Sequence, residues 1–505
     1  MSKLKLASIL LLISTLILKF SSMIRDIVIA NLFGDSYMAS AYLAAMLIPN
    51  ALILFMLTGM KEAFLPSYFK YDKEGKGFSH LTNIVKGTFW ISVLLAIGGV
   101  LLSPFVIPIL FPFNEHGTEI AIWTSVIYFF SVIFVGLNAV YEGFFDAQRK
   151  FSFSTLSQTI VVFSTIGGAL ILYKQLGIYG VPLGYLIGTI LSFFIKLIYL
   201  RPKGFMDWKQ SLDRQEVKAF YLIFMPVGLT IAVGQVNLLV NSLFASRLGE
   251  SVVANLNYAF RLVNIPQAIF GVTIATIIFP ILARAKSKDD MNLFKVGIEK
   301  GLMYMFLLLA PTVAGMLVLM NEFVQVVYER GAFSSEATAL TSEYALFYVG
   351  SVLFYSIQAV IAKGFYTLEK GHYMLRIGII SIICNVIFNS ILVNIMGGAG
   401  LALSASLVGF IYSAITFTTL YKLTGGFNIS VVAKEYGKIF IATMFMVGSL
   451  IGLEYQFGLS RIGAVPYLIV MIIIGAVLYF IALGLLKTHS LFEILQKGRV
   501  KGASS

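Results

Sequence analysis

Three cations lie inside apolar segments of the chain, where a charge is costly. Lys19 and Arg25, the latter followed by Asp26, fall in the stretch LKFSSMIRDIVIANLFG, and Arg261 falls in a later stretch of similar design. A charge at the centre of a membrane helix costs roughly 2.5–3.5 kcal/mol on insertion scales, so it usually faces a cavity or a partner. We interpret these side chains as lining a central cavity that handles an anionic substrate inside the bilayer.

The spacing within the first helix sets the depth of each charge. Lys19 comes fourteen residues after Lys5, which places it roughly 21 Å above the inner boundary, and Arg25 lies roughly 9 Å further out. Lys19 and Asp26 are seven residues apart and share a helix face. Arg25 therefore has two interpretations: a cavity residue, or an interfacial anchor paired with Asp26.

Arg261 stands at a similar depth in its own segment. It follows Glu250 by eleven residues, which is roughly 16 Å from the outer side and close to mid-membrane. The planar fork of an arginine suits phosphate oxygens. The alternative is a structural arginine bonded to carbonyl groups or to a buried acid.

The composition is that of an integral membrane protein. Of 505 residues, 58% are hydrophobic and 12% are charged, whereas a soluble domain has about 25% charged residues. The single cysteine, Cys384, excludes a disulfide within the chain. The net charge of +13 is typical of basic cytoplasmic loops, and the absence of a basic–aromatic module argues against nucleic acid as a partner.

Apolar segments long enough to span a bilayer, about 20 residues each, recur fourteen times. This pattern predicts an all-α polytopic membrane protein with both termini on one side. The segments lie near residues 4–24, 38–60, 84–110, 119–143, 154–173, 177–200, 219–245, 254–282, 300–327, 342–367, 374–396, 399–421, 438–457 and 463–486.

The distribution of basic residues predicts that both termini are cytoplasmic. With the N-terminus inside, the inner loops and helix ends hold most lysines and arginines, Lys61 and Lys196 among them. The outer loops and helix ends hold only Arg25, Lys174, Arg247, Arg330 and Arg461. Residues 1–23 lack a small-residue cleavage site, so we interpret them as a retained first helix.

An internal repeat predicts two parallel six-helix lobes. Short elements recur in order at offsets of 214 to 221 residues, such as Ile48-Pro49-Asn50 with Ile265-Pro266-Gln267, and Phe64-Leu65-Pro66 with Ile278-Phe279-Pro280. Six helices separate the copies, so both insert with one orientation, related by an axis along the membrane normal. Pro49, Pro226, Pro266 and Pro311 interrupt apolar segments, as is common in membrane helices that move.

These observations divide the chain into six parts. They are an N-terminal lobe (1–200), a linker (201–218), a C-terminal lobe (219–422), a second linker (423–437), helices thirteen and fourteen (438–487) and a cytoplasmic tail (488–505). Each linker is expected to be either an amphipathic basic helix on the inner membrane surface or a plain solvated loop.

Enzyme chemistry is not indicated. His116, His372 and His489 lie in loops or tails, no histidines are paired at metal-ligand spacing, and no acidic pair recurs at catalytic spacing on one helix. The chain has no phosphate-binding glycine-rich loop. We therefore expect neither a catalytic residue nor a metal or other cofactor.

Three stretches resemble one family. RDIVIANLFGDSYMASAYLAAMLIPN, NYAFRLVNIPQAIFGVTIATIIFPILAR and VYERGAFSSEATALT are similar to the MurJ (MviN-type) proteins, lipid II flippases of the multidrug/oligosaccharidyl-lipid/polysaccharide exporter superfamily. The resemblance covers residues ~5–422. It implies two six-helix lobes around a cationic cavity, and a hydrophobic groove near helices thirteen and fourteen for a polyprenyl tail.

The resemblance also implies a binding site and a location. The expected substrate-binding residues are Lys19, Arg25, Asp26, Asn50 and Arg261, with Arg25 and Arg261 at positions matching the family's cavity arginines. They would engage the pyrophosphate of an undecaprenyl-linked peptidoglycan precursor. The protein is expected to act as a monomer in the bacterial cytoplasmic membrane.

Several positions depart from the family's pattern. Lys19 occupies a usual arginine position, and Ile53 and Leu54 stand where some members have arginines. Ser40 and Asn264 each replace an acidic residue, and Asn241, Asn385 and Asn389 stand near the sodium site of some members. These departures leave sodium coupling and strict lipid II specificity open.

Four functions are compared. The first is a lipid II flippase that works by alternating access, with Lys19, Arg25 and Arg261 on the pyrophosphate. The second is a flippase for another polyprenyl-linked oligosaccharide, such as a capsule or exopolysaccharide unit. A drug/cation antiporter is disfavoured by the cavity cations, and a membrane glycosyltransferase by the absence of a catalytic acid and a large soluble loop.

Overall fold

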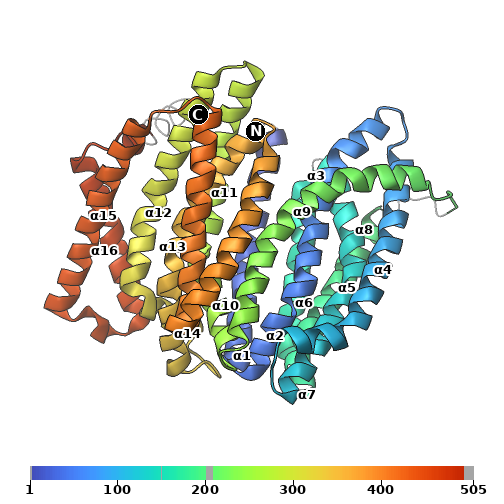
Figure 1. The fold of residues 1–505 in the computed structure, drawn as a ribbon, viewed down its shortest axis with the longest axis horizontal. Helices are drawn as coiled ribbons and strands as arrows, with labels where there is room; N and C mark the ends of the chain where they lie inside the picture. The colour runs from blue at the N-terminus through green and yellow to red at the C-terminus, as the bar shows by residue number, and fades with distance from the viewer. Residues whose placement is uncertain (1–2, 149, 201–208, 494–505) are drawn as a thin grey trace. The chain divides into compact units, whose positions relative to one another are not determined.

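The computed structural model describes residues 3–148, 150–200 and 209–493, and the regular structure there is entirely helical (Figure 1). The helices are α1 (Lys3–Phe33), α2 (Tyr37–Ala45), α3 (Leu47–Asp72), α4 (Gly77–Leu110), α5 (Glu115–Ala147), α6 (Phe151–Ile171), α7 (Tyr173–Leu176), η1 (Gly177–Tyr179), α8 (Gly180–Leu200), α9 (Arg214–Ala245), α10 (Val252–Val263), α11 (Ile265–Ser287), α12 (Met291–Tyr328), α13 (Ser335–Thr367), α14 (Gly371–Leu423), α15 (Ile429–Phe457), η3 (Leu459–Ile462) and α16 (Ala464–Leu485).

The all-helical membrane architecture is confirmed. Within the described residues, ten helical segments are long and apolar enough to cross a bilayer. One of them, α14, contains two of the predicted segments, and its backbone leaves the helical region at Gly397 (φ 57°, ψ −132°), between those two segments. Three further predicted segments correspond to α1, α9 and the pair α10–α11. The count of fourteen remains a prediction.

The helices extend well beyond their apolar cores. The second predicted segment ends near residue 60, yet α3 continues to Asp72, and α4 begins at Gly77 rather than near residue 84. Hydropathy marks only the part of a helix that meets hydrocarbon, whereas the backbone hydrogen bonds continue into the polar region. Only residues 73–76 separate the two helices.

Two helices break at matching positions of the internal repeat. Met46 separates α2 from α3, and Asn264 separates α10 from α11. Pro49 and Pro266 then fall in the first turn of the helix that follows each break. A proline lacks the N–H that a helix interior needs but not the one in a first turn, so it starts a new helix at little cost.

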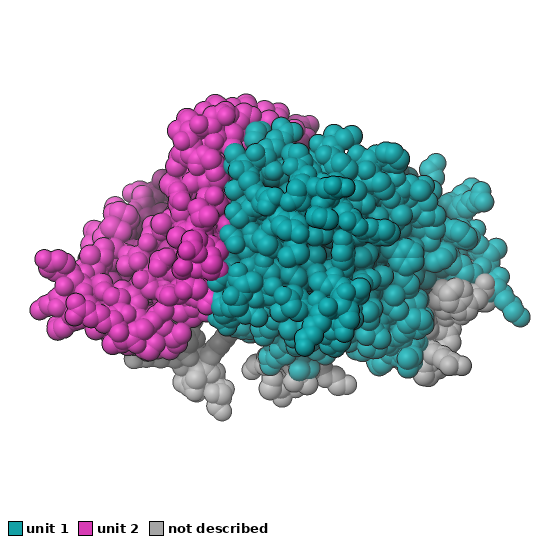
Figure 2. Space-filling model, turned by 90° about the horizontal axis from the view of Figure 1, so that it is seen from below, with its two compact units in different colours: residues 1–254, 330–333 teal, residues 255–329, 334–505 magenta. Residues whose placement is uncertain are grey.

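The described chain forms two compact units (Figure 2). Unit 1 comprises residues 1–254 and 330–333, and unit 2 comprises residues 255–329 and 334–505. In unit 1, α3 packs against α5 and α9, and α6 packs against α1 and α8. In unit 2, α13 packs against α12 and α14, and α15 packs against α12 and α16.

Each unit has its own apolar core. In unit 1 the core is rich in aromatic side chains from α3, α5 and α9, including Phe64, Tyr141 and Phe224. In unit 2, Leu307 of α12 packs with Met446 of α15 and Met471 of α16. The first linker lies outside the described residues from 201 to 208, and residues 429–437 of the second form the first turns of α15.

The third of the family-like stretches contains a loop that packs on the end of α1. Residues 330–333 belong to unit 1, and the Ala332 N–H donates to the carbonyl of Asn31 (2.9 Å). Gly331 and Gly34 both have positive φ (61° and 58°), and a Cβ on either would lie within 2.4 Å of a backbone oxygen of the other segment. Only glycine permits this backbone approach.

Candidate functional site

The predicted site residues of α1 and α3 lie in unit 1 and differ in exposure. Lys19 is exposed on α1, whereas Asn50 is half-buried in the first turn of α3. The Asn50 N–H donates to the carbonyl of Met46, the N-cap of α3 (2.9 Å), as part of the first turn of that helix. Asn50 thus stands directly at the break between α2 and α3.

Arg25 and Asp26 form an ion pair inside unit 1. Both Nε and Nη2 of Arg25 donate to Oδ1 of Asp26, at 3.1 and 2.9 Å. The Asp26 side chain is 11% exposed and that of Arg25 is 23% exposed. The pairing that the sequence left open is therefore present, and it occupies two of the five guanidinium donors.

Three tyrosines surround this ion pair. The hydroxyls of Tyr42 (α2) and Tyr128 (α5) lie 3.0 Å apart, and the ring of Tyr185 (α8) packs 4.8 Å from that of Tyr128. All three hydroxyls are close enough to Arg25 to interact with its charge. Side chains from four helices, α1, α2, α5 and α8, thus form a polar cluster. These tyrosines escaped the sequence analysis because no spacing along the chain links them.

Arg261 lies in unit 2, in the last turn of α10. It is half-buried and stands three residues before the break at Asn264, whose side-chain amide donates to the carbonyl of Phe260 (2.7 Å). A helix end next to a break places a long side chain where the backbone can change direction. The joint action of Arg261 with the cations of unit 1 remains a prediction.

A second polar cluster in unit 1 was missed by the sequence analysis. Glu142 of α5 accepts from two lysines: Lys196 Nζ (α8) lies 3.0 Å from Oε1, and Lys61 Nζ (α3) lies 2.8 Å from Oε2. Ser157 and Gln158 of α6 also donate to this carboxylate. Four helices are therefore joined by one carboxylate that is 1% exposed.

The charge pattern did not indicate that the lysines of this cluster are paired inside the protein; their placement on the inner side remains a prediction. Lys61 and Lys196 were counted among the basic residues of inner loops and helix ends, but Lys196 is completely buried and Lys61 pairs inside the bundle. The signal that could have found the cluster is Glu142, an acidic residue near the end of a predicted span.

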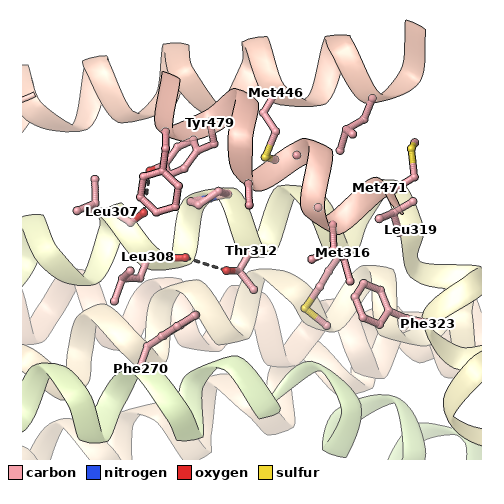
Figure 3. Close-up of a pocket in the computed structure, with 17 residues that line it drawn as sticks. Phe270, Leu307, Leu308, Thr312, Met316, Leu319, Phe323, Met446, Met471 and Tyr479 are labelled. Carbon is pink, nitrogen blue, oxygen red and sulfur yellow. Dashed lines mark hydrogen bonds between the residues drawn. The ribbon is translucent and has the colours of Figure 1, made fainter. Parts of the chain in front are cut away.

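Unit 2 contains an apolar pocket of about 320 Å³ between α12, α15 and α16 (Figure 3). Met316 and Phe323 of α12, Met446 of α15 and Met471 of α16 line it. The two hydroxyls of its wall are already used within the protein: Thr312 donates to the carbonyl of Leu308 (2.8 Å), and Tyr479 donates to that of Leu307 (2.7 Å). The pocket therefore suits a hydrocarbon chain.

Each unit offers one kind of surface, a cation in unit 1 and an apolar pocket in unit 2. A guanidinium is a bidentate donor to phosphate oxygens, and the carboxylate of Asp26 keeps that guanidinium compensated when no anion is bound. The apolar pocket of unit 2 can take a lipid chain. None of these contacts requires covalent chemistry by the protein.

Comparison with known proteins gives consistent matches along the chain. The sequence model of one family, described as lipid II flippase MurJ, matches residues 29–471. Curated relatives include a lipid II flippase MurJ of Burkholderia cenocepacia, 25% identical over 81% of this chain and 82% of the relative. A probable lipid II flippase MurJ of Aquifex aeolicus is 25% identical over 98% of both chains.

Solved structures show the same fold. A lipid II flippase MurJ in an inward closed conformation superposes with a TM-score of 0.80 at 24% identity, over 94% of this chain and 98% of that one. An inward-facing multidrug resistance MATE family transporter of the MOP superfamily reaches a TM-score of 0.71 at 14% identity, over 83% of this chain and 98% of that one. These two likenesses concern the fold alone.

Proposed function

We propose a function for this protein on the basis of its family: the chain belongs to the lipid II flippase MurJ family. The proposed function is the transfer of lipid II, an undecaprenyl-pyrophosphate-linked peptidoglycan precursor, from the inner to the outer leaflet of the bacterial cytoplasmic membrane. The family match over residues 29–471 carries this proposal, and the ion pair and the apolar pocket supply its chemistry.

The pyrophosphate would be held by exchange of anions at Arg25. In the structure Asp26 accepts from Arg25, with the Tyr42 and Tyr128 hydroxyls nearby. A pyrophosphate brings several acceptor oxygens and more charge than one carboxylate, so it can compete with Asp26 for the guanidinium donors. Asp26 can restore the original pair when the substrate leaves, which supports release as well as binding.

The polyprenyl tail would lie in the apolar pocket of unit 2. The wall of this pocket exposes methionine, leucine and phenylalanine side chains, and its hydroxyls are satisfied internally. Methionine adapts its shape to irregular partners at little cost. A flexible isoprenoid chain therefore fits this surface better than a rigid planar drug.

Transport is proposed to occur by alternating access of the two six-helix lobes that the repeat predicts, residues 1–200 and 219–422. Helices thirteen and fourteen stay outside the lobes, and both termini are cytoplasmic in this proposal. The helix breaks at Met46 and Asn264 each lie beside a predicted cation or polar site residue. They support the proposal that these helices bend during transport. The protein is proposed to act as a monomer, by conformational change rather than catalysis.

Rescue of a bacterium depleted of its own lipid II flippase tests this function. Wild type, Arg261→Ala and the exposed control Arg284→Ala would be expressed at matched membrane levels. The expected result is rescue by wild type and Arg284→Ala, with loss of rescue in Arg261→Ala. Full rescue by Arg261→Ala would contradict the proposed role of the cation.

A flippase for another polyprenyl-linked oligosaccharide is the second candidate. It is favoured by Ile53 and Leu54 of α3, which are apolar where some family members have arginines; Ile53 is also buried. Failure of well-expressed wild type to rescue would support this candidate. A glycosyltransferase cluster beside the gene would then point to the glycan.

A further inference from the structure

The two lysines that share Glu142 differ in how completely they are bound. The buried Lys196 donates to Asn138 Oδ1 (2.7 Å), Glu142 Oε1 (3.0 Å) and Ser192 Oγ (3.2 Å), which uses all three ammonium donors. Among the residues that the structure describes, Lys61 donates to two partners, Glu142 Oε2 and Ser154 Oγ, both at 2.8 Å. Its side chain is 25% exposed, whereas that of Lys196 is 0% exposed.

The carboxylate of Glu142 remains compensated when Lys61 is taken away. Its Oε1 still accepts from Lys196 and from Ser157 (3.2 Å), and its Oε2 still accepts from Gln158 (2.7 Å). Removing one partner of a buried ion pair is usually costly because the other charge is left alone. Here Lys196 remains as the resident counter-ion, so Lys61 can leave Glu142 without that penalty.

One other carboxylate affects this site. Asp146, one turn further along α5, is half-buried and interacts electrostatically with Lys61. Within the described chain it makes no ion pair with Lys61. It therefore weakens the attraction of an incoming anion but does not occupy the third donor of the ammonium.

The position of the cluster suits the headgroup level of a bilayer. Glu142 lies five residues before the end of α5, and Lys196 lies four residues before the end of α8, so both are roughly 6–8 Å inside their helix ends. The interfacial layer on each side of the hydrocarbon is roughly 5–8 Å thick. A lysine stem can place its ammonium within that layer.

We propose that Lys61 is a phosphate-binding cation that exchanges partners. Its ammonium moves away from Glu142 and binds the phosphate of an anionic lipid at this end of unit 1. The diphosphate of a prenyl lipid and the phosphate of an ordinary anionic phospholipid share the required chemistry. The proposal rests on the proposed function only where it names a prenyl diphosphate as the carrier. Lys61 would then be a first contact for the substrate head.

Binding measurements on the full-length protein in phosphatidylcholine nanodiscs test this site. The probes are farnesyl diphosphate, inorganic pyrophosphate and, by native mass spectrometry, phosphatidylglycerol. Lys61→Gln is expected to weaken binding of at least one lipid probe by about tenfold or more, as loss of a charge-assisted hydrogen bond implies. The matched control is Lys70→Gln, an exposed lysine further along α3, which is expected to change binding less than about twofold.

Two further variants separate binding from folding. Lys61→Arg keeps the cation and is expected to retain binding. The charge-balanced double variant Glu142→Gln/Lys196→Met removes the competing carboxylate together with its resident counter-ion, and it is expected to bind as tightly as wild type or more tightly. If the double variant loses binding as fully as Lys61→Gln, the cluster is structural and the proposal is overturned.

The probes also separate this proposal from the proposed function. If binding of farnesyl diphosphate alone depends on Lys61, Lys61 is a substrate contact. If binding of phosphatidylglycerol depends on Lys61, Lys61 belongs to a structural lipid site. Either result supports the phosphate-binding cation. If no probe depends on Lys61, the site is refuted even where Arg261→Ala abolishes rescue. If wild type fails to rescue, the proposed function fails, and the dependence of probe binding on Lys61 still decides between a phosphate-binding cation and a structural lysine.

Discussion

The crossing of α6 and α8 gives the sharpest prediction, because two neighbouring glycines have opposite surroundings. A Cβ added at Gly168 would lie 2.4 Å from the carbonyl oxygen of Gly180 and 2.6 Å from Cα of Gly184. A Cβ added at Gly167 would meet nothing within 4 Å. Gly168→Ala must therefore disturb the crossing, and Gly167→Ala must not.

The size of the effect follows from these distances. Ordinary contact begins near 3.4 Å, so the two backbones must separate by about 1 Å to admit the methyl group. Such overpacking costs typically ~1–3 kcal/mol. Both substitutions gain about the same helix propensity, up to ~1 kcal/mol, so the difference between the variants isolates the packing cost. We expect Gly168→Ala to be less stable than Gly167→Ala by ~1–3 kcal/mol.

Thermal unfolding of the purified protein measures this difference. Two of the three tryptophans, Trp90 and Trp123, lie in the described part of unit 1, and the third, Trp208, lies outside the described residues. Fluorescence of Trp90 and Trp123 reports on the unit that contains the crossing. A domain of this size shifts its midpoint by about 2–4 °C per kcal/mol, and Gly168→Ala is expected to melt several degrees below Gly167→Ala. Equal midpoints for the two variants would refute the reasoning. Because α8 bears Lys196 and α6 bears Gln158, the less stable variant is also expected to transport less.

Three further predictions concern the two polar clusters and the apolar pocket. Gly315→Leu, at an open position of the pocket wall, places four carbons where a lipid chain would lie and should weaken tail binding by at most ~3 kcal/mol. Rescue by this variant should therefore fall. The control Gly452→Leu on α15, also in open space but outside the pocket lining, should leave rescue unchanged. Glu142→Gln leaves Lys196 buried without its counter-ion and should destabilise the protein by ~3–5 kcal/mol. The double variant Glu142→Gln/Lys196→Met should recover stability in a melting curve, and a failure to recover would contradict the explanation by an uncompensated charge. Tyr42→Phe leaves the buried Tyr128 hydroxyl without its partner and should cost ~1–3 kcal/mol, measured as a lower melting midpoint; an unchanged midpoint would mean that water replaces the hydroxyl.

Part of the candidate site was predictable because it depends on single residues. Arg25, Asp26 and Arg261 stand out as charges within apolar stretches, and the cost of such charges is a property of one position. The alternative pairing of Arg25 with Asp26 was also visible, since the two are adjacent, and the structure contains that pair. Helix breaks do occur before Pro49 and Pro266. Pro226 and Pro311, which were expected to interrupt their segments in the same way, lie inside α9 and α12.

The buried cluster shows what could not be predicted. Lys61, Glu142 and Lys196 are separated by 81 and 54 positions, and no local pattern links them. In the charge distribution the two lysines look like ordinary inner-side residues, which is how they were interpreted. Their burial became apparent only when α3, α5, α6 and α8 were packed together.

The sequence by itself determined that this chain is an all-helical membrane protein with an internal repeat and a family resemblance. Those properties depend on hydropathy over about 20 residues, on proline, and on repeated short motifs, all of which are local. Only the tertiary structure decided which charges are neighbours, which lysine is saturated, and where an apolar wall encloses space for a lipid chain. Partner choice and enclosed volume depend on how distant helices pack, because hydrogen bonds and cavities form between surfaces that the chain brings together only when it folds.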